Sequence, residues 1–107
     1  MASKSRNKGN YHERWFVKWL EAIGLKAKRQ PLSGSLGGEY SGDIVVEIKG
    51  QRLVAEVKYR DTSNFPNPFK VLDNRDIALY KRRRGDPQTL VIIPGDLFAT
   101  LIREENN

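Results

Sequence analysis

Two apolar segments joined by Lys49-Gly50 constrain the fold of this chain more than any other feature. Residues 44–48 and 53–57 are rich in Ile, Val and Leu. The glycine stands where a two-residue hairpin turn requires a positive φ. The pattern therefore predicts an antiparallel strand pair. Three ionisable residues interrupt it where apolar or neutral side chains would be usual: Asp43, Glu56 and Lys58.

The turn decides whether these three residues share one face of the strand pair. Side chains alternate along a strand, so Glu56 and Lys58 project to the same side. A turn at Lys49-Gly50 places Asp43 opposite Glu56, and a turn at Gly50-Gln51 places it opposite Lys58. A three-residue loop would instead send Asp43 to the other face. Two carboxylates and a lysine on one face are what a metal-dependent phosphodiesterase needs.

The alternative for this cluster is a structural ion pair on a solvated strand. Val54, Ala55 and Val57 flank the charged residues, however, and indicate a central strand with both faces covered. Charges in such a strand need partners or a metal ion. We therefore favour the catalytic interpretation.

A fourth candidate, Glu13, lies in a predicted amphipathic helix over residues 11–23. Phe16, Val17 and Leu20 form one stripe at the helical repeat, and Glu13 lies within that stripe. A carboxylate on a core-facing stripe is costly unless a cation or hydrogen-bond donors meet it. The alternative is a carboxylate in the first turn, where the helix dipole favours it.

Charge and composition narrow the class of partner. The 107 residues carry a formal charge of +6 and include one histidine and no cysteine. This excludes disulfides, thiolate zinc sites and multi-histidine metal sites. The excess positive charge favours a nucleic acid over a solvated basic surface. The basic residues gather in three clusters: Lys4, Arg6 and Lys8; Lys26, Lys28 and Arg29; and Lys81, Arg82, Arg83 and Arg84.

The order of predicted elements indicates an α/β fold. We expect residues 1–9 to form a flexible basic arm and residues 10–107 to form a single domain. Within it we expect a strand at 25–30, a Gly/Ser-rich loop at 31–42, a helix at 73–84, a strand at 88–93 and a helix at 97–103 capped by Asp96. This order suits a small mixed β-sheet flanked by helices. The chain has no segment long enough to span a bilayer and no signal-peptide pattern, so we expect a cytoplasmic protein.

Several motifs resemble those of the PD-(D/E)xK nuclease superfamily. Gly42-Asp43 is followed, after twelve intervening residues, by Glu56-Val57-Lys58. The resemblance is closer still to the archaeal-type Holliday junction resolvases and their phage-borne relatives. The segments that carry it are Lys8-Gly9 before Glu13, then Lys28-Arg29, then Ser33-Gly34-Ser35. Gly42 stands where the superfamily name has Pro.

The resemblance implies a restriction-endonuclease-like nuclease core that binds branched double-stranded DNA as a homodimer. Its metal ligands would be Asp43, Glu56 and the Val57 carbonyl, with Glu13 completing the shell. Mg²⁺ is the implied cofactor, and Mn²⁺ is a substitute. Lys58 would orient the attacking water or stabilise charge.

The implied DNA contacts are Arg14, Arg29, Ser33 and Ser35, beside the basic clusters. Two alternatives remain open. The first is another endonuclease of the superfamily, such as a nickase, and the second is a non-catalytic basic nucleic-acid-binding module.

Overall fold

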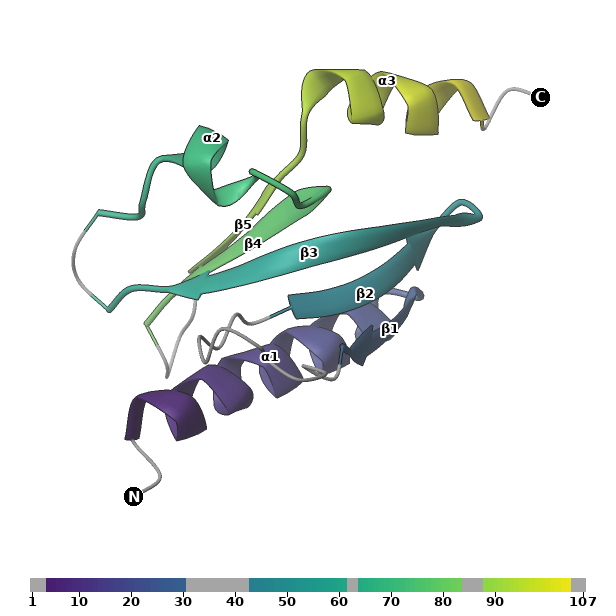
Figure 1. The fold of residues 1–107 in the computed structure, drawn as a ribbon. Helices are drawn as coiled ribbons and strands as arrows, with labels where there is room; N and C mark the ends of the chain where they lie inside the picture. The colour runs from purple at the N-terminus through teal and green to yellow at the C-terminus, as the bar shows by residue number, and fades with distance from the viewer. Residues whose placement is uncertain (1–3, 31–42, 62–63, 84–87, 105–107) are drawn as a thin grey trace.

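A five-stranded mixed sheet with helices on both sides organises the protein (Figure 1). The computed structural model describes residues 4–30, 43–61, 64–83 and 88–104, with residues 4–10, Asp43 and Glu104 described by their backbone alone. The elements in chain order are α1 (Lys4–Ala22), β1 (Lys26–Arg29), β2 (Asp43–Ile48), β3 (Gln51–Tyr59), α2 (Pro68–Val71), β4 (Ile77–Arg82), β5 (Gln88–Ile92) and α3 (Gly95–Glu104). The sheet order is β1-β2-β3-β4-β5, and only the pairing of β3 with β4 is parallel. The predicted small mixed α/β sheet is confirmed.

The hairpin of β2 and β3 has the register that a turn at Lys49-Gly50 dictates. Both turn residues have positive φ, 51° for Lys49 and 83° for Gly50, as a type I′ turn requires. The strand register then pairs Asp43 with Glu56 and Ile48 with Gln51. The tight turn thus fixes the relative position of the two candidate carboxylate residues.

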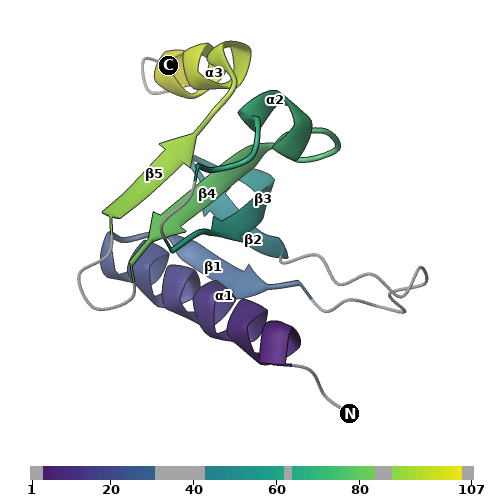
Figure 2. The ribbon, with the colours of Figure 1, turned by 90° about the vertical axis from the view of Figure 1, so that its left-hand side faces the viewer.

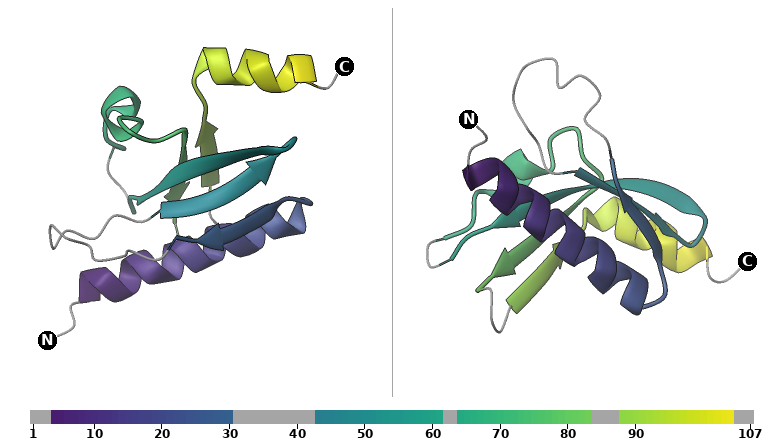
Figure 3. Two further views of the ribbon diagram at one scale, coloured as in Figure 1. Left: turned by 45° about the vertical axis from the view of Figure 1, so that its right-hand side comes forward. Right: turned by 90° about the horizontal axis from the view of Figure 1, so that it is seen from below.

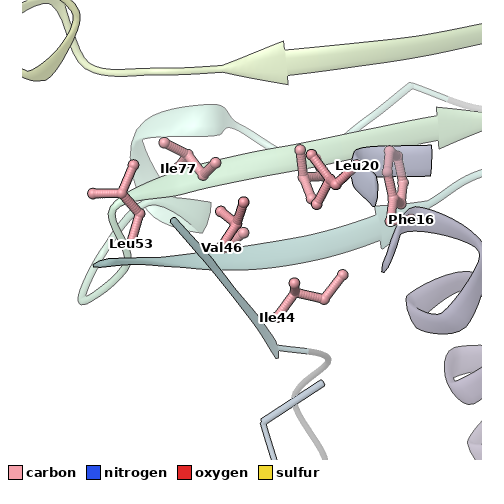
Figure 4. Packing of buried hydrophobic residues seen from close by; sticks show 8 residues of the cluster. Phe16, Leu20, Ile44, Val46, Leu53 and Ile77 are labelled. Atoms are coloured by element: carbon pink, nitrogen blue, oxygen red, sulfur yellow. The ribbon is translucent and has the colours of Figure 1, made fainter. Parts of the chain in front are cut away.

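The hydrophobic core lies between α1 and one face of the sheet (Figures 2 and 3). Phe16 and Leu20 project from α1 onto apolar residues of β2, β3 and β4. Figure 4 shows this packing. The fully assembled cluster is Phe16, Leu20, Ile44, Val46, Leu53, Ala55, Ile77 and Leu79. Burying a side chain as large as Phe16 contributes about 1.5–3 kcal/mol, so this stripe anchors α1 to the sheet.

The prediction of a helix over residues 73–84 is wrong, because this region contains β4. Asp76 attaches the start of β4 to β3 through two hydrogen bonds with Val54. The Asp76 Oδ2 accepts from the Val54 backbone N–H at 2.7 Å, and the Asp76 backbone N–H donates to the Val54 carbonyl at 2.8 Å. Ile77 to Tyr80 are then buried between β3 and β5. Ala, Leu, Lys and Arg favour helices intrinsically, but burial in the sheet outweighs that preference.

Two helix boundaries also differ from expectation. Helix α1 begins at Lys4, so residues 4–9, predicted as part of a flexible arm, are helical; Lys and Arg favour continuation of the helix. Helix α3 begins at Gly95, so Asp96 lies in its first turn and the Phe98 N–H donates to Pro94. Among the helices in the described part of the chain, none is long and apolar enough to cross a membrane.

The connection from β3 to β4 runs through residues 60–76. Parallel neighbours cannot be joined by a tight turn and need such a crossover. It carries the short helix α2, which lies on the side of the sheet opposite α1 (Figures 1 and 2). The crossover therefore lies over the face of β3 that α1 does not cover.

Candidate active site

Glu56 lines a pocket between β3 and the crossover. Leu53 and Ala55 of β3 face α1 in the core, so strand alternation directs Glu56 and Lys58 to the opposite face. Glu56 is only 7% exposed. The pocket has a volume of about 720 Å³ and is lined by Glu56, Lys58, Arg60, Pro66, Lys70, Val71, Asp73, Asn74 and Arg75.

Two cations hold the Glu56 carboxylate. The Arg75 Nε donates to Glu56 Oε1 at 2.9 Å, and the Lys58 Nζ lies 3.7 Å from Oε2. Such partners offset the cost of burying a carboxylate. The turn that positions Arg75 includes Asn74 at a φ of 65°, a conformation that Asn tolerates better than most residues. The site therefore presents a carboxylate in a strongly cationic setting.

Asp43 occupies the neighbouring position on β2. Its backbone pairs directly with Glu56, and directly opposed residues project to the same face of a sheet. The register thus places Asp43, Glu56 and Lys58 on one face, as the Lys49-Gly50 turn predicts. Because Asp43 is described by its backbone alone, its role as a ligand stays a prediction.

Glu13 forms a separate ion pair on the side of α1. Its Oε1 accepts from the Arg29 Nε at 2.9 Å. The Glu13 side chain is 3% exposed and that of Arg29 is 37% exposed. Arg29 pairs with Ile44 of the core, so it lies on the face of the sheet that α1 covers. The structure therefore brings Glu13 to Arg29, on the opposite face of the sheet from Glu56, and meets the predicted need for a cation.

Three cations of the pocket escaped the sequence analysis. Arg60 follows Lys58 by two residues, so strand alternation could have found it. Lys70 and Arg75 come from the crossover, which brings them over Glu56. No local pattern identifies these two, because their proximity to Glu56 depends on the parallel pairing of β3 and β4. Together with Lys58, they make the pocket suited to an anionic ligand.

Lys81 was predicted to bind DNA, and the structure corrects this. The side chain is fully buried. Its Nζ lies 4.0 Å from the centroid of the Trp15 ring, 5.0 Å from that of Tyr11 and 3.4 Å from His12 Nδ1. Cation–π contacts of this kind stabilise a desolvated ammonium group. Lys81 therefore belongs to the packing of α1 on β4 and is inaccessible to DNA.

The remaining predicted DNA contacts are distributed over several elements. Arg14 and Arg83 are exposed, and Arg82 lies over the Phe65 ring at 5.4 Å. Lys4, Arg6 and Lys8 lie in α1 with only their backbone described, and Ser33, Ser35 and Arg84 lie outside the described residues. These positions stay predictions.

The donor set suits a hard divalent cation at the Asp43 and Glu56 pair. Carboxylate and carbonyl oxygens are the ligands that Mg²⁺ prefers, and water completes its shell. Among the described side chains, which leave out Asp43, no three His, Cys, Asp or Glu residues are grouped to hold a metal. Glu56 is ion-paired with Lys58 and Arg75, so a divalent cation bound there would have to compete with these two side chains. The residues present therefore fit a site of few protein ligands.

The model of one family, described as archaeal Holliday junction resolvase (hjc), matches residues 4–90. The match covers α1 through most of β5 and includes Glu13, Asp43, Glu56 and Lys58. No curated protein matches the chain.

Proposed function

Because this chain belongs to the archaeal Holliday junction resolvase family and is thus a junction-binding nuclease, we propose that it resolves four-way junctions by metal-dependent, symmetric hydrolysis of two phosphodiester bonds. One observation carries the assignment of the site. Glu56 is buried and lines a pocket with several cations, with the Lys58 ammonium at 3.7 Å and Asp43 directly opposite on β2.

Asp43, Glu56 and the Val57 carbonyl are the proposed ligands of one or two Mg²⁺ ions, with Mn²⁺ as a substitute. Once bound, the metal would supply positive charge that favours deprotonation of water and offsets charge on the phosphate. Lys58 stands beside Glu56 and would orient the attacking water or stabilise the developing negative charge. No covalent intermediate is needed for this hydrolysis.

The cations around the pocket are proposed to position the DNA backbone. Arg60 and Lys70 are both exposed and line the pocket that contains Glu56. Arginine and lysine contacts to phosphates fix the register of a duplex without reading its sequence. Arg14, Arg29 and Arg83 would add contacts outside the pocket. The proposed ligand is therefore branched double-stranded DNA that is held mainly by its phosphates.

Glu13 is proposed to act through Arg29. The guanidinium of Arg29 is partly exposed, and the buried Glu13 carboxylate holds it in place. This arrangement favours a positioning role for Glu13. The family resemblance suggests a second role, completion of the metal shell. Metal binding by a Glu13→Gln variant distinguishes the two roles.

We further propose that two copies act together, since a four-way junction must be cut in two strands and each copy supplies one such site. Trp15 and Trp19 are partly buried against the core cluster, so they offer less exposed apolar surface than α3, where Phe98 and Ile102 are exposed one helical turn apart. On the edge strand β5, Leu90 and Val91 are also exposed but project to opposite faces of the sheet. The α3 surface of Phe98 and Ile102 is the proposed contact between copies.

The alternatives are another endonuclease of this type, such as a nickase, and a non-catalytic DNA-binding module. Incubating the protein with a four-way junction and with a linear duplex, with and without Mg²⁺, separates all three. Paired cuts in the junction that need Mg²⁺ support the proposal. Single nicks favour the nickase, and binding without cleavage favours the module. Light scattering with and without junction DNA tests the dimer, and a monomer that still makes paired cuts would refute it.

A further inference from the structure

Phe69 is the most exposed large apolar side chain in the described part of the chain. It is 85% exposed, whereas the next, Ile23, is 58% exposed. Phe69 lies on α2, and Lys70 and Val71, which follow it directly, line the pocket that contains Glu56. An aromatic ring therefore stands in solvent on the short helix that also contributes Lys70 and Val71 to the pocket.

The backbone that carries Phe69 is held by several contacts. Asn67 Oδ1 accepts from the Phe69 N–H at 2.9 Å, as the N-cap of α2. Pro66 and Pro68 restrict the backbone on either side of this cap. The Tyr80 hydroxyl of β4 donates to the Pro66 carbonyl at 2.9 Å. The segment is thus fastened to the sheet while the ring of Phe69 is left outside.

Phe65 strengthens the same attachment. Its ring centroid lies 4.5 Å from that of Tyr80, and the Arg82 guanidinium lies 5.4 Å from the Phe65 centroid. An anchored backbone lets the Phe69 ring meet a ligand with little loss of conformational freedom.

The charge around Phe69 identifies the kind of ligand. Asn67 and Lys70 beside it are exposed, and the adjoining pocket is lined by Lys58, Arg60 and Arg75. Buried centres of protein–protein interfaces are depleted in lysine and rich in neighbouring apolar residues. A single aromatic ring beside basic side chains is instead typical of surfaces that bind nucleic acid by stacking on bases. The surroundings therefore favour DNA over a second protein chain.

We propose that Phe69 stacks on a base at the branch point of the junction while the neighbouring cations hold the backbone. This inference rests on the proposed function. At a branch point the continuous stacking of a duplex is interrupted, so base faces are available there that a linear duplex keeps covered. Phe69 would thus favour branched over linear DNA without reading sequence.

The test is binding of a fluorescently labelled four-way junction and a linear duplex, measured by anisotropy in EDTA so that no cleavage occurs. The variants are Phe69→Ala, Phe69→Trp and Phe69→Leu, with Ile23→Ala as the matched control for removal of an exposed apolar side chain. Alanine substitution of a stacking aromatic lowers affinity about 5- to 150-fold. We expect that loss for the junction alone in Phe69→Ala, and near wild-type binding in Phe69→Trp and Ile23→Ala.

Each other outcome has a defined meaning. Equal losses for junction and duplex in Phe69→Ala, or full junction affinity in Phe69→Leu, would overturn the stacking role. A fall in molar mass on light scattering of Phe69→Ala would assign the ring to self-association instead. If the wild-type protein itself shows no preference for the junction, the proposed function fails. If it keeps that preference without Phe69, only the stacking inference fails.

Discussion

Arg75 and Glu56 form a hydrogen-bonded ion pair, with 2.9 Å between Nε and Oε1, inside the candidate active site. The guanidinium thus engages one of the carboxylate oxygens proposed to bind metal. A divalent cation that binds Oε1 must share this oxygen with Arg75 or displace it, and one that binds Oε2 lies beside the Lys58 ammonium. Arg75 is therefore positioned to compete with the proposed metal at Oε1.

We expect Arg75→Met to raise the affinity for Mn²⁺ about threefold to tenfold, which corresponds to roughly 0.7–1.4 kcal/mol. The substitution removes a positive charge beside Glu56 and keeps an apolar stem of similar length. Isothermal titration calorimetry with Mn²⁺ in the absence of DNA measures the change. Lower Mn²⁺ affinity would contradict competition between Arg75 and the metal.

Glu56→Gln and Glu13→Gln should affect different properties. Glu56→Gln should abolish cleavage and weaken Mn²⁺ binding, because it removes a ligand charge, while DNA binding stays near wild type. Glu13→Gln should leave Mn²⁺ binding unchanged and weaken junction binding, because Arg29 loses its charged partner. Calorimetry and anisotropy on both variants provide the comparison. Weaker Mn²⁺ binding in Glu13→Gln would assign Glu13 to the metal shell.

Two basic residues, Lys81 in β4 and Arg83 just after the strand, should separate stability from DNA binding. Lys81→Ala leaves a cavity under Trp15 and should lower the free energy of unfolding by about 2–4 kcal/mol. It should not alter the salt dependence of DNA binding. Arg83→Ala should leave stability within about 0.5 kcal/mol of wild type and make the slope of log K against log salt shallower by about 1.

For about six neutralised phosphates, the slope of log K against log salt for the wild-type protein is expected near −5. A flat salt response would argue against phosphate-based binding.

Tyr80 should make stability dependent on alkaline pH. Burial raises the pKa of its hydroxyl above the ordinary value of 10.0, and the charge of Arg60 partly opposes this. A raised folded-state pKa means that the stabilisation is complete below about pH 10 and is lost as pH rises through the folded-state pKa. Tyr80→Phe should cost about 1 kcal/mol at pH 7, since the bond to Pro66 is lost. Urea unfolding at pH 7 and pH 10.5 should show this difference shrinking, and a difference that grows with pH would contradict the assignment.

The local parts of the site could be predicted from sequence. Strand alternation with either two-residue turn placed Asp43, Glu56 and Lys58 on one face, and the structure has the Lys49-Gly50 turn, which pairs Asp43 with Glu56. The apolar stripe of α1 identified Phe16 and Leu20 as core and Glu13 as a carboxylate that needs a partner. These features depend on residues close in sequence and on the regular geometry of strands and helices.

The missed features depend on contacts between distant segments. A short apolar run such as residues 77–80 is compatible with a helix or a buried strand, and only its pairing with β3 decides between them. The same pairing buries Lys81 beneath Trp15 and brings Arg75 to Glu56. A run of basic residues on a strand alternates between faces, so Lys81 and Arg82 meet different surroundings although they are neighbours in sequence.

The crossover from β3 to β4 has a consequence for how such a nuclease can diversify. Topology requires a segment of this length to join parallel strands, but it leaves the residues within that segment largely free. Here the segment supplies Lys70 and Arg75 to the pocket that contains Glu56 and carries the exposed Phe69, while the core cluster contains no residue from it. Exchanging residues 67–74 between relatives, which keeps Arg75 and the contacts of Phe65 and Pro66 with Tyr80, should therefore transfer preference for a DNA shape with little loss of stability. The DNA shape that such an enzyme prefers can then change through substitutions in the crossover, while Asp43, Glu56 and Lys58 stay the same.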